Sequence, residues 1–314
     1  MTRIGNSDLD IFPLVFGGNV FGWTADAPTS FALLDAFVGA GGDMIDTADG
    51  YSHWVAGNSG GESETIIGAW MAARHNRDRV LIATKVGTHP AFEGLRAANI
   101  SAAVDASLAR LGTDHVDLYY AHFDDAAVPM DEIVGALSAL VDAGKVRYIA
   151  PSNFSPERLD EWAGVANQYG YHEAVALQPQ YSLMERGFET NGLRDAAARH
   201  HLGVLTYSSL ASGFLSGKYR SGAVVASARA ERVAKYLDGR GEPVLEALRE
   251  VAGDHGVGPS AVALAWLRAQ PTVVAPIASA SRVEQMADLM AGGSLELAAD
   301  EVAALSAASA GQRD

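Results

Sequence analysis

The stretch MIDTADGYS brings two carboxylates and a phenol, Asp46, Asp49 and Tyr51, within six residues of one another. Asp46 ends an apolar run, and a charge at the end of a buried strand is costly unless it is paired or used. Asp49 lies in the loop between the other two, where we expect a solvated carboxylate and not a catalyst. Further along the chain, the apolar runs IATK and LYYAH end on Lys85 and His122.

Four of these groups, Asp46, Tyr51, Lys85 and His122, together favour one kind of chemistry. Asp46 and Lys85 are predicted to form an ion pair across neighbouring strands, and such a pair seldom stabilises a protein more than an apolar pair does. Tyr51 supplies a chemical reason for it, because an ammonium lowers the pKa of a nearby phenol from about 10 and makes it a usable general acid. His122 would hydrogen-bond a substrate oxygen. Together the residues indicate protonation of a carbonyl oxygen.

The segments that must position these groups alternate between apolar strands and amphipathic helices. Eight strands are predicted, at 14–18, 43–46, 80–85, 116–122, 146–153, 174–179, 203–207 and 272–277. Strands that are apolar throughout are typical of parallel sheets buried on both faces. Helices are expected between them, with start signals such as Asn99 and Asp131 and stop signals such as Gly112 and Gly144. The pattern predicts an α/β fold of the (β/α)8 TIM-barrel type, with a doubly wound open sheet as its rival.

Polar groups recur where the predicted strands end. In chain order they are Asp46, Lys85, His122, Ser152 with Asn153, Gln178 and Tyr207. Active sites of (β/α)8 barrels lie at this C-terminal face of the strands. We expect one domain over 1–314, with an N-terminal β-hairpin at about 3–12, a long loop at about 208–240, and an extra C-terminal helix and tail at about 295–314.

Composition excludes several classes of function. The chain of 314 residues has 23 basic and 38 acidic residues and a formal net charge of −15, which disfavours nucleic acid and anionic membranes as partners. It has no cysteine, no apolar run long enough to span a membrane and no apolar start typical of a secretory signal, so a cytoplasmic protein is expected. Nothing in the sequence indicates an oligomeric state.

Six motifs in this order, IDTADGY, GGESETIIG, ATK, YYAH, SNF and YSSLASGFLSGKY, resemble the aldo-keto reductases from about Leu14 to Met290. The resemblance implies a (β/α)8 barrel that binds NADP(H) in extended form at the C-terminal face of the strands, without a Rossmann fold. It also implies that Asp46, Tyr51, Lys85 and His122 are the catalytic tetrad of a reductase that acts on aldehydes or ketones, with the tyrosine as proton donor.

The same resemblance assigns cofactor contacts. Ser152, Asn153 and Gln178 would hold the nicotinamide carboxamide, and Tyr207 would stack on its ring. The segment from Ser208 to Leu215, with Lys218, would wrap the pyrophosphate. Within the first of these segments, Leu210 and Gly213 are further cofactor-binding candidates. On the segment that would meet the adenosine phosphate, the candidates are Ile277, Ser279, Arg282, Gln285 and Asp288. Arg282 and Lys218 favour NADP(H), because cations that pair with its additional phosphate stabilise the bound cofactor.

Trp23, Trp54 and Phe123 are candidates for an apolar substrate pocket, and Asp124 and Asp125 would disfavour anionic substrates. We therefore expect a neutral small-molecule carbonyl substrate. The alternative is a cofactor-binding, redox-sensing or regulatory subunit with little turnover. A metal-dependent barrel hydrolase would need a tight ligand spacing such as His-x-His at a strand end, which the chain lacks, so no metal is expected. A short-chain dehydrogenase is excluded because no tyrosine is followed four residues later by lysine.

Overall fold

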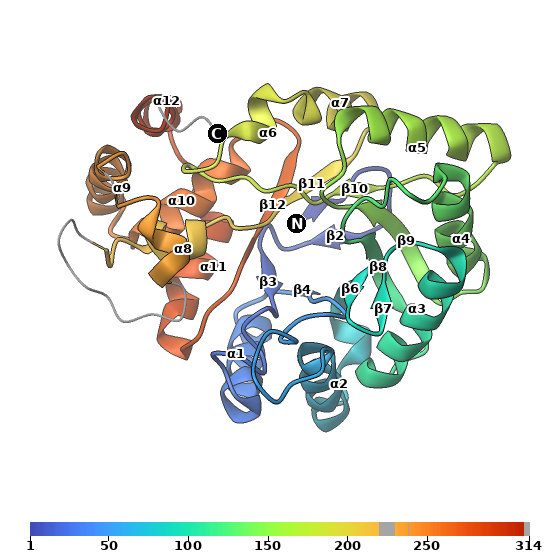
Figure 1. The fold of residues 1–314 in the computed structure, drawn as a ribbon. Coiled ribbons are helices and arrows are strands. Elements are labelled where there is room, and N and C mark those ends of the chain that lie inside the picture. Colours follow the sequence, from blue (N-terminus) through green and yellow to red (C-terminus); the bar gives the residue numbers. More distant parts are fainter. Residues whose placement is uncertain (220–229, 238, 311–314) are drawn as a thin grey trace.

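The computed structural model describes residues 1–219, 230–237 and 239–310, and its centre is a parallel sheet rolled into a barrel (Figure 1). Eight strands follow one another around this sheet in the order β10 (Ala176–Leu177), β11 (Gly203–Thr206), β12 (Val273–Ala278), β3 (Val15–Gly17), β4 (Met44–Asp46), β5 (Leu81–Val86), β8 (Val116–Ala121) and β9 (Val146–Pro151). The isolated bridges Ile149 to Ala174 and Ser152 to Gln178 join the two ends of the sheet. All eight predicted strands are confirmed, and the open sheet is not found.

Helices surround the strands on every side in Figure 1. Those of the first five units are α1 (Ala27–Gly39), α2 (Glu62–Arg74), α3 (Ala97–Leu111), α4 (Met130–Asp142) and α5 (Pro156–Tyr169). The remaining helices are α6 (Gly187–Thr190), α7 (Leu193–Arg199), α8 (Ala230–Ala234), α9 (Glu242–His255), α10 (Pro259–Arg268), α11 (Met286–Ser294) and α12 (Ala299–Ala308). Short 3-10 turns occur at η1 (Arg77–Arg79), η2 (Ala211–Ser216) and η3 (Val283–Gln285).

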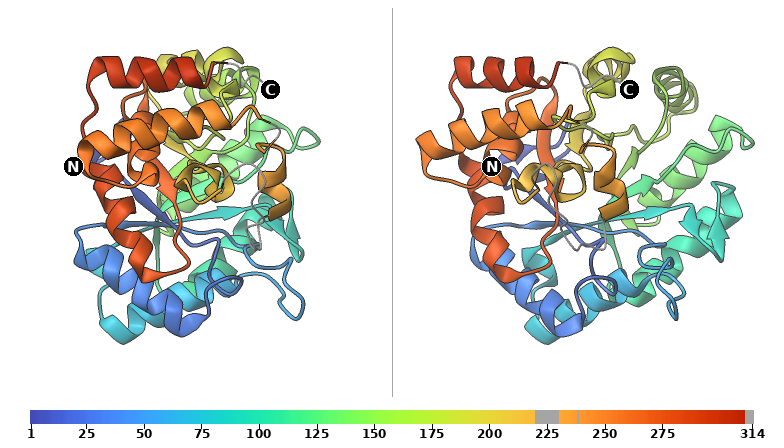
Figure 2. Two further views of the ribbon diagram at one scale, coloured as in Figure 1. Left: turned by 90° about the vertical axis from the view of Figure 1, so that its left-hand side faces the viewer. Right: turned by 60° about the vertical axis from the view of Figure 1, so that its left-hand side comes forward.

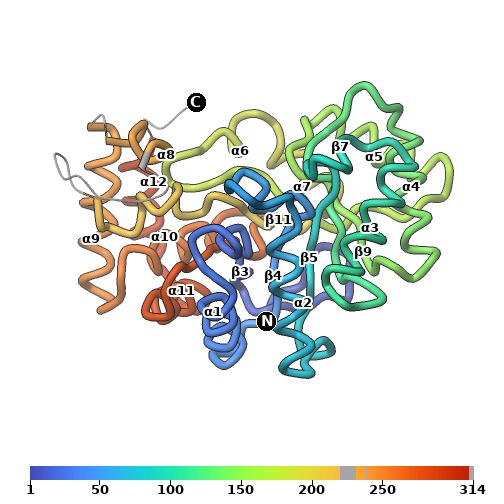
Figure 3. The backbone as a smooth tube through the Cα atoms, turned by 60° about the horizontal axis from the view of Figure 1, so that its bottom comes forward, coloured from blue at the N-terminus to red at the C-terminus, as the bar shows by residue number. Residues whose placement is uncertain are grey.

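The last helices form one flank of the barrel. Figure 2 shows the orange and red helices packed side by side, and α10 contacts both α9 and α11. Figure 3 shows α8 next to α9 on this flank. The segment 208–240, which we predicted to be a long loop, contains η2 and α8. Residues 220–229 and 238 of this segment lie outside the described residues. The predicted C-terminal helix is α12, and 311–314 of the predicted tail also lie outside them.

Two hairpins extend the barrel. The predicted N-terminal hairpin is confirmed as β1 (Thr2–Arg3) paired antiparallel with β2 (Asp10–Ile11). A second hairpin, β6 (Thr88–His89) with β7 (Phe92–Glu93), was not predicted, because strands of two residues are too short to show any periodicity. Both residues predicted as helix starts lie inside their helices, since α3 begins at Ala97 and α4 at Met130. The side chain of Asn99 instead bonds the carbonyls of Phe92 and Gly94.

The eight barrel strands are largely buried on both faces, which explains their continuous apolar runs. Met44 of β4 and Leu118 of β8 belong to an interior cluster, together with Ile4 and Ile11 of the N-terminal hairpin. Their neighbours along each strand, such as Ile45, pack instead with the helices in a larger outer cluster. Within residues 1–219, 230–237 and 239–310, none of the helices combines the length and the apolar character that crossing a membrane requires.

Candidate active site

The alternation of side chains along β4 and β5 brings the predicted ion pair together. Met44 lies in the interior cluster, so Asp46, two residues later, projects to the same side of the sheet. The same step leads from Ala83, another interior residue, to Lys85. Because β4 and β5 are paired in parallel, both side chains reach the same end of the barrel. The ammonium of Lys85 donates to Asp46 Oδ2 at 2.6 Å, so the predicted ion pair is confirmed.

Lys85 is fully buried and uses all three of its donors. Its Nζ bonds the Asp46 carboxylate, the Thr47 carbonyl at 2.7 Å and the Tyr51 hydroxyl at 3.1 Å. Burial alone would lower the pKa of this ammonium, but Asp46 and Tyr51 outweigh burial and raise it. Gln178, which follows β10, donates to the second oxygen of Asp46 at 2.9 Å. The cation is therefore permanent, and its counter-ion is fixed from two sides.

Tyr51 sits in a tight loop after β4 that returns its ring toward the strand ends. Its backbone N–H bonds the Ala48 carbonyl at 3.3 Å, and the next residue, Ser52, has a positive φ of 71° and donates to the Phe21 carbonyl. The ring of Tyr51 lies 4.9 Å from Lys85 Nζ. Because the phenol oxygen accepts from Lys85, its own hydrogen remains available for another acceptor.

The predicted pKa of Tyr51 was wrong in direction. Burial raises the pKa of the phenol above its usual value, and Lys85 opposes this shift without cancelling it. The ammonium therefore does not produce a phenolate near neutral pH. It holds a protonated tyrosine in place, which is the form that can give up a proton.

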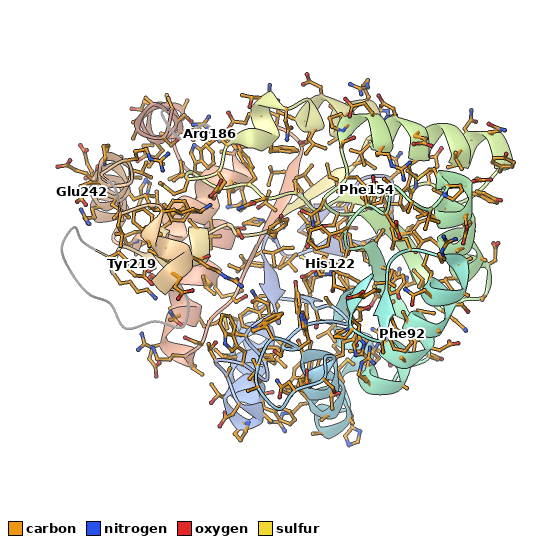
Figure 4. The ribbon with its side chains drawn as sticks, viewed as in Figure 1. Phe92, His122, Phe154, Arg186, Tyr219 and Glu242 are labelled. Carbon is orange, nitrogen blue, oxygen red and sulfur yellow. The ribbon has the colours of Figure 1, made fainter. Side chains whose placement is uncertain are left out.

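His122 follows β8, at the same end of the barrel, and Figure 4 shows it near the middle of the ring of strands. Its ring lies 6.0 Å from that of Tyr51 and is stacked on Phe123. Burial, and next Lys85, hold the pKa of the imidazole well below its usual value, so the ring is neutral at pH 7. Its Nδ1 is 3.1 Å from the Thr88 hydroxyl. Nε2 has no hydrogen-bond partner in the described part of the chain.

Asp49 is not the solvated loop carboxylate that we expected. Its side chain is fully buried beneath the β5–β6 connection, where Oδ2 accepts from the Gly87 N–H at 3.3 Å and Oδ1 lies 3.4 Å from the Thr88 hydroxyl. Burial, and next the charge of Glu64, raise the pKa of Asp49 to about 7. Thr88 was missed altogether. Its only signal in the sequence is its place three residues after Lys85, directly beyond a strand end.

The side chains predicted to hold the nicotinamide lie together after β9, β10 and β11. The Tyr207 hydroxyl donates to Asn153 Oδ1 at 2.7 Å, and Ser152 Oγ donates to the Gln178 carbonyl at 2.8 Å. Asn153 Nδ2 in turn donates to the His122 carbonyl at 2.9 Å. Asn153 and Tyr207 also line a cavity of about 220 Å³. The group therefore combines amide donors, a hydroxyl and an aromatic face next to the Lys85 ion pair.

The segment predicted to wrap a pyrophosphate turns sharply after β11. Ser208, Ser212 and Gly213 have positive φ values of 54°, 58° and 93°. Lys218 is exposed, and its Nζ lies 3.5 Å from the position that a Cβ on Gly213 would take. A Cβ at that position would meet the ammonium at ordinary van der Waals distance, so what favours glycine here is the positive φ. The two other candidates here differ in exposure, since Leu215 is buried and Leu210 is half-buried.

The candidates near the end of β12 mainly organise the local backbone. Gln285 Oε1 accepts from the N–H groups of Ser281 and Arg282, and Asp288 Oδ1 accepts from the Gly258 N–H at the start of α10. Ile277 is buried within β12, and Ser279 donates to Asn19 at 2.6 Å. Arg282 is exposed at the start of η3. The roles of these residues toward a cofactor stay predictions.

The predicted pocket aromatics border Tyr51 and His122. Trp54 is 42% exposed and makes edge contacts with Trp23 at 5.7 Å and Tyr51 at 6.3 Å, while Phe123 is 51% exposed beside His122. The two acidic residues that follow are engaged, since Asp124 pairs with Arg158 and Asp125 accepts from the N–H groups of Leu95 and Ala127. Among the residues that the structure describes, no three His, Asp or Glu side chains are grouped to hold a metal.

The buried Asp49 predicts a pH-dependent stability. Its pKa is about 7 in the folded protein and ordinary in the unfolded chain, so the folded state binds more protons between about pH 4 and pH 7. Stability is therefore lost as pH rises through that range. Asp49→Asn cannot titrate, and we expect its free energy of unfolding relative to wild type to improve by on the order of 3 kcal/mol from pH 4.5 to pH 8.

Urea denaturation at both pH values measures this. Asp35→Asn is a control of opposite sign, because Arg74 lowers the pKa of Asp35 and its removal should weaken the protein more at pH 8 than at low pH. An equal effect of Asp49→Asn at both pH values would contradict the raised pKa.

Comparisons with known proteins agree with this geometry. The sequence model of the Aldo/keto reductase family matches residues 13–310. Protein tas of Escherichia coli is 31% identical, over 97% of this chain and 96% of its own length. The uncharacterized oxidoreductase YrpG of Bacillus subtilis is 36% identical over 91% and 89%, and a probable voltage-gated potassium channel subunit beta of rice, Oryza sativa, is 32% identical over 92% and 89%. The chain belongs to the aldo/keto reductase family.

Proposed function

We propose that this protein is an NADPH-dependent reductase that converts a neutral aldehyde or ketone to an alcohol. Family membership implies an oxidoreductase. The observation that carries the proposal is the hydrogen-bonding of Tyr51, whose oxygen accepts from a buried ammonium while its hydrogen remains free. A phenol held in this way is a general acid aimed at an acceptor in the open part of the site.

Each catalytic side chain has one role in the proposed reaction. A bound reduced nicotinamide supplies the hydride. Tyr51 gives its proton to the carbonyl oxygen, and the adjacent Lys85 stabilises the negative charge that remains on the phenol oxygen. Asp46 keeps Lys85 charged and fixes its position. His122, neutral and with Nε2 open, orients the carbonyl oxygen by donating a hydrogen bond to it.

The residues after β9 to β12 suit a pyridine dinucleotide. Ser152, Asn153 and Gln178 offer amide and hydroxyl groups for a carboxamide, and Tyr207 offers a ring face for the nicotinamide. The left-handed turn around Gly213 with Lys218 nearby suits phosphate oxygens. Ser208, Leu210, Leu215, Ile277, Ser279, Arg282, Gln285 and Asp288 complete the proposed cofactor site. We favour NADP(H) because Arg282 is an exposed cation on the segment proposed to meet the adenosine phosphate.

Trp23, Trp54 and Phe123 would contact the substrate. Trp54 and Phe123 are exposed and Trp23 is half-buried, and their rings favour an apolar body next to the carbonyl. Asp124 is neutralised by Arg158, so the preference for an uncharged substrate now rests on these rings and on the net charge of −15. The absence of cysteine supports a cytoplasmic location, which we likewise propose.

A regulatory role with little turnover is the second candidate. It is favoured by the similarity to the probable potassium channel beta subunits of rice and of Arabidopsis thaliana, the latter 31% identical. Turnover separates the candidates, because a reductase should oxidise NADPH steadily with simple aldehydes, whereas a sensing subunit should bind NADPH and turn over very slowly.

Removing the Tyr51 hydroxyl tests the proton donor. Tyr51→Phe should lower kcat for aldehyde reduction by roughly 100- to 10,000-fold, because general acid catalysis contributes about that much. Its affinity for NADPH, measured by fluorescence titration, should stay close to wild type. Tyr169→Phe, at the exposed end of α5 away from the site, is the matched control and should keep the wild-type kcat. An unchanged kcat in Tyr51→Phe would refute the assignment.

Removing the Arg282 charge tests the cofactor preference. Arg282→Ala should weaken NADPH binding by roughly tenfold or more, as for the loss of a charge-assisted hydrogen bond, and leave NADH binding unchanged. Fluorescence titration with both nucleotides measures the effect. Arg3→Ala, on the N-terminal hairpin, should change neither affinity. An equal loss for NADPH and NADH would remove Arg282 from the proposed phosphate site.

A further inference from the structure

Two side chains, Thr88 and Asp49, form a connected line behind the His122 imidazole. Thr88 Oγ1 lies 3.1 Å from His122 Nδ1 and 3.4 Å from Asp49 Oδ1. The close approach of Thr88 depends on Gly50, since a Cβ there would come within 2.7 Å of the threonine hydroxyl. The line therefore runs from a fully buried carboxyl group to a ring whose other nitrogen has no hydrogen-bond partner among the described residues.

The Thr88 hydroxyl has one hydrogen and two neighbours that can receive it. If Asp49 is ionised, the hydroxyl donates to the carboxylate, and His122 Nδ1 must carry a hydrogen to bond the threonine oxygen. If Asp49 is protonated, its carboxyl donates to Thr88, and the hydroxyl then donates to a bare Nδ1. The direction of both bonds reverses with one proton.

The reversal changes what His122 presents to a substrate. A neutral imidazole has one N–H, so a hydrogen on Nδ1 leaves Nε2 as an acceptor, and a bare Nδ1 makes Nε2 a donor. A carbonyl oxygen has only lone pairs, and it needs the donor form. The acceptor form would repel it.

We propose that Asp49 is a positioning residue whose protonation state, passed through Thr88, selects the tautomer of His122 and so switches the catalytic site on. Its effect on turnover rests on the proposed function. In the switching step one proton adds to Nε2, the Nδ1 hydrogen passes to Thr88 Oγ1, and the threonine hydrogen passes to Asp49 Oδ1. The imidazole is neutral before and after, and the proton gained resides on Asp49.

The surroundings of both end groups are compatible with this exchange. Burial and Glu64 of α2 raise the pKa of Asp49 to about 7, and Arg110 of α3, which is paired with Glu64 at 2.7 Å, lowers it only in part. Lys85 of β5 faces His122 and, after burial, helps to lower the pKa of its ring. The other titratable groups in contact with this region are Tyr51 after β4, His89 on β6 and Tyr119 on β8. Asp49 is thus the group that titrates near pH 7 while His122 stays neutral.

The tautomer can be observed without any turnover. In protein labelled with 15N in its histidine rings, the His122 signals, assigned by comparison with His122→Asn, should report a hydrogen on Nε2 at pH 6 and on Nδ1 at pH 8.5. In Asp49→Asn the amide oxygen is expected to accept from the Gly87 N–H, which leaves the amide nitrogen to donate to Thr88, so the variant should keep the hydrogen on Nε2 at both pH values. Thr88→Val should remove the pH dependence of the tautomer, and Thr88→Ser should retain it.

The kinetic test follows the same variants. Wild-type kcat/KM for aldehyde reduction should fall by nearly tenfold per pH unit above about pH 7, while Asp49→Asn and Thr88→Val lose this limb of the profile. Asp43→Asn is the matched control, since it changes another partly buried carboxyl with a raised pKa, just before β4, and should leave the profile unaltered.

Two results would overturn the inference: a wild-type tautomer that is the same at pH 6 and pH 8.5, or an Asp49→Asn profile that keeps the wild-type limb. A tautomer that follows Asp49 in a protein without reductase turnover would support the inference and refute the proposed function instead.

Discussion

The site depends on one buried ammonium, each of whose three donors meets an acceptor of the protein. Lys85 can remain charged inside the barrel only because Asp46, the Thr47 carbonyl and the Tyr51 oxygen meet it at hydrogen-bond distance. These acceptors come from the end of β4 and the loop that follows it. The parallel pairing of β4 with β5, and the tight loop that returns Tyr51, are therefore conditions for burying the charge at all.

The other polar groups around Lys85 are either uncharged or held by an opposite charge and a hydrogen-bond donor. Burial keeps Tyr51 protonated and His122 uncharged, and Gln178 supplies an amide to the free oxygen of Asp46. One fixed positive charge, one fixed negative charge and two uncharged side chains that can donate are what the proposed stabilisation of a developing oxyanion requires. Asp49, which lies behind Thr88 and His122, is a carboxyl group whose pKa of about 7 lets it gain or lose a proton near neutral pH.

The sequence predicted what depends on strands and failed where the decisive contacts are tertiary. Apolar runs revealed all eight barrel strands, and the positions of Asp46 and Lys85 at the ends of neighbouring strands were enough to predict that they meet. The burial of Asp49 could not be seen, because it results from a short hairpin that the sequence does not indicate and that covers the loop with Thr88. The direction of the Tyr51 pKa was missed for a similar reason, since the desolvation of a ring depends on what packs over it.

The pairing between β9 and β10 has few hydrogen bonds, and this weak seam lies next to the site. β10 has only two residues, and isolated bridges alone join its surroundings to β9, whereas β8 and β9 pair along nearly their whole length. Amide hydrogens at such a seam should exchange with solvent at a lower opening free energy than those of the other barrel strands. Gln178 follows β10 directly, so each opening of the seam would also release the amide that steadies Asp46. Local opening between β9 and β10 would therefore also loosen the ion pair of Asp46 with Lys85.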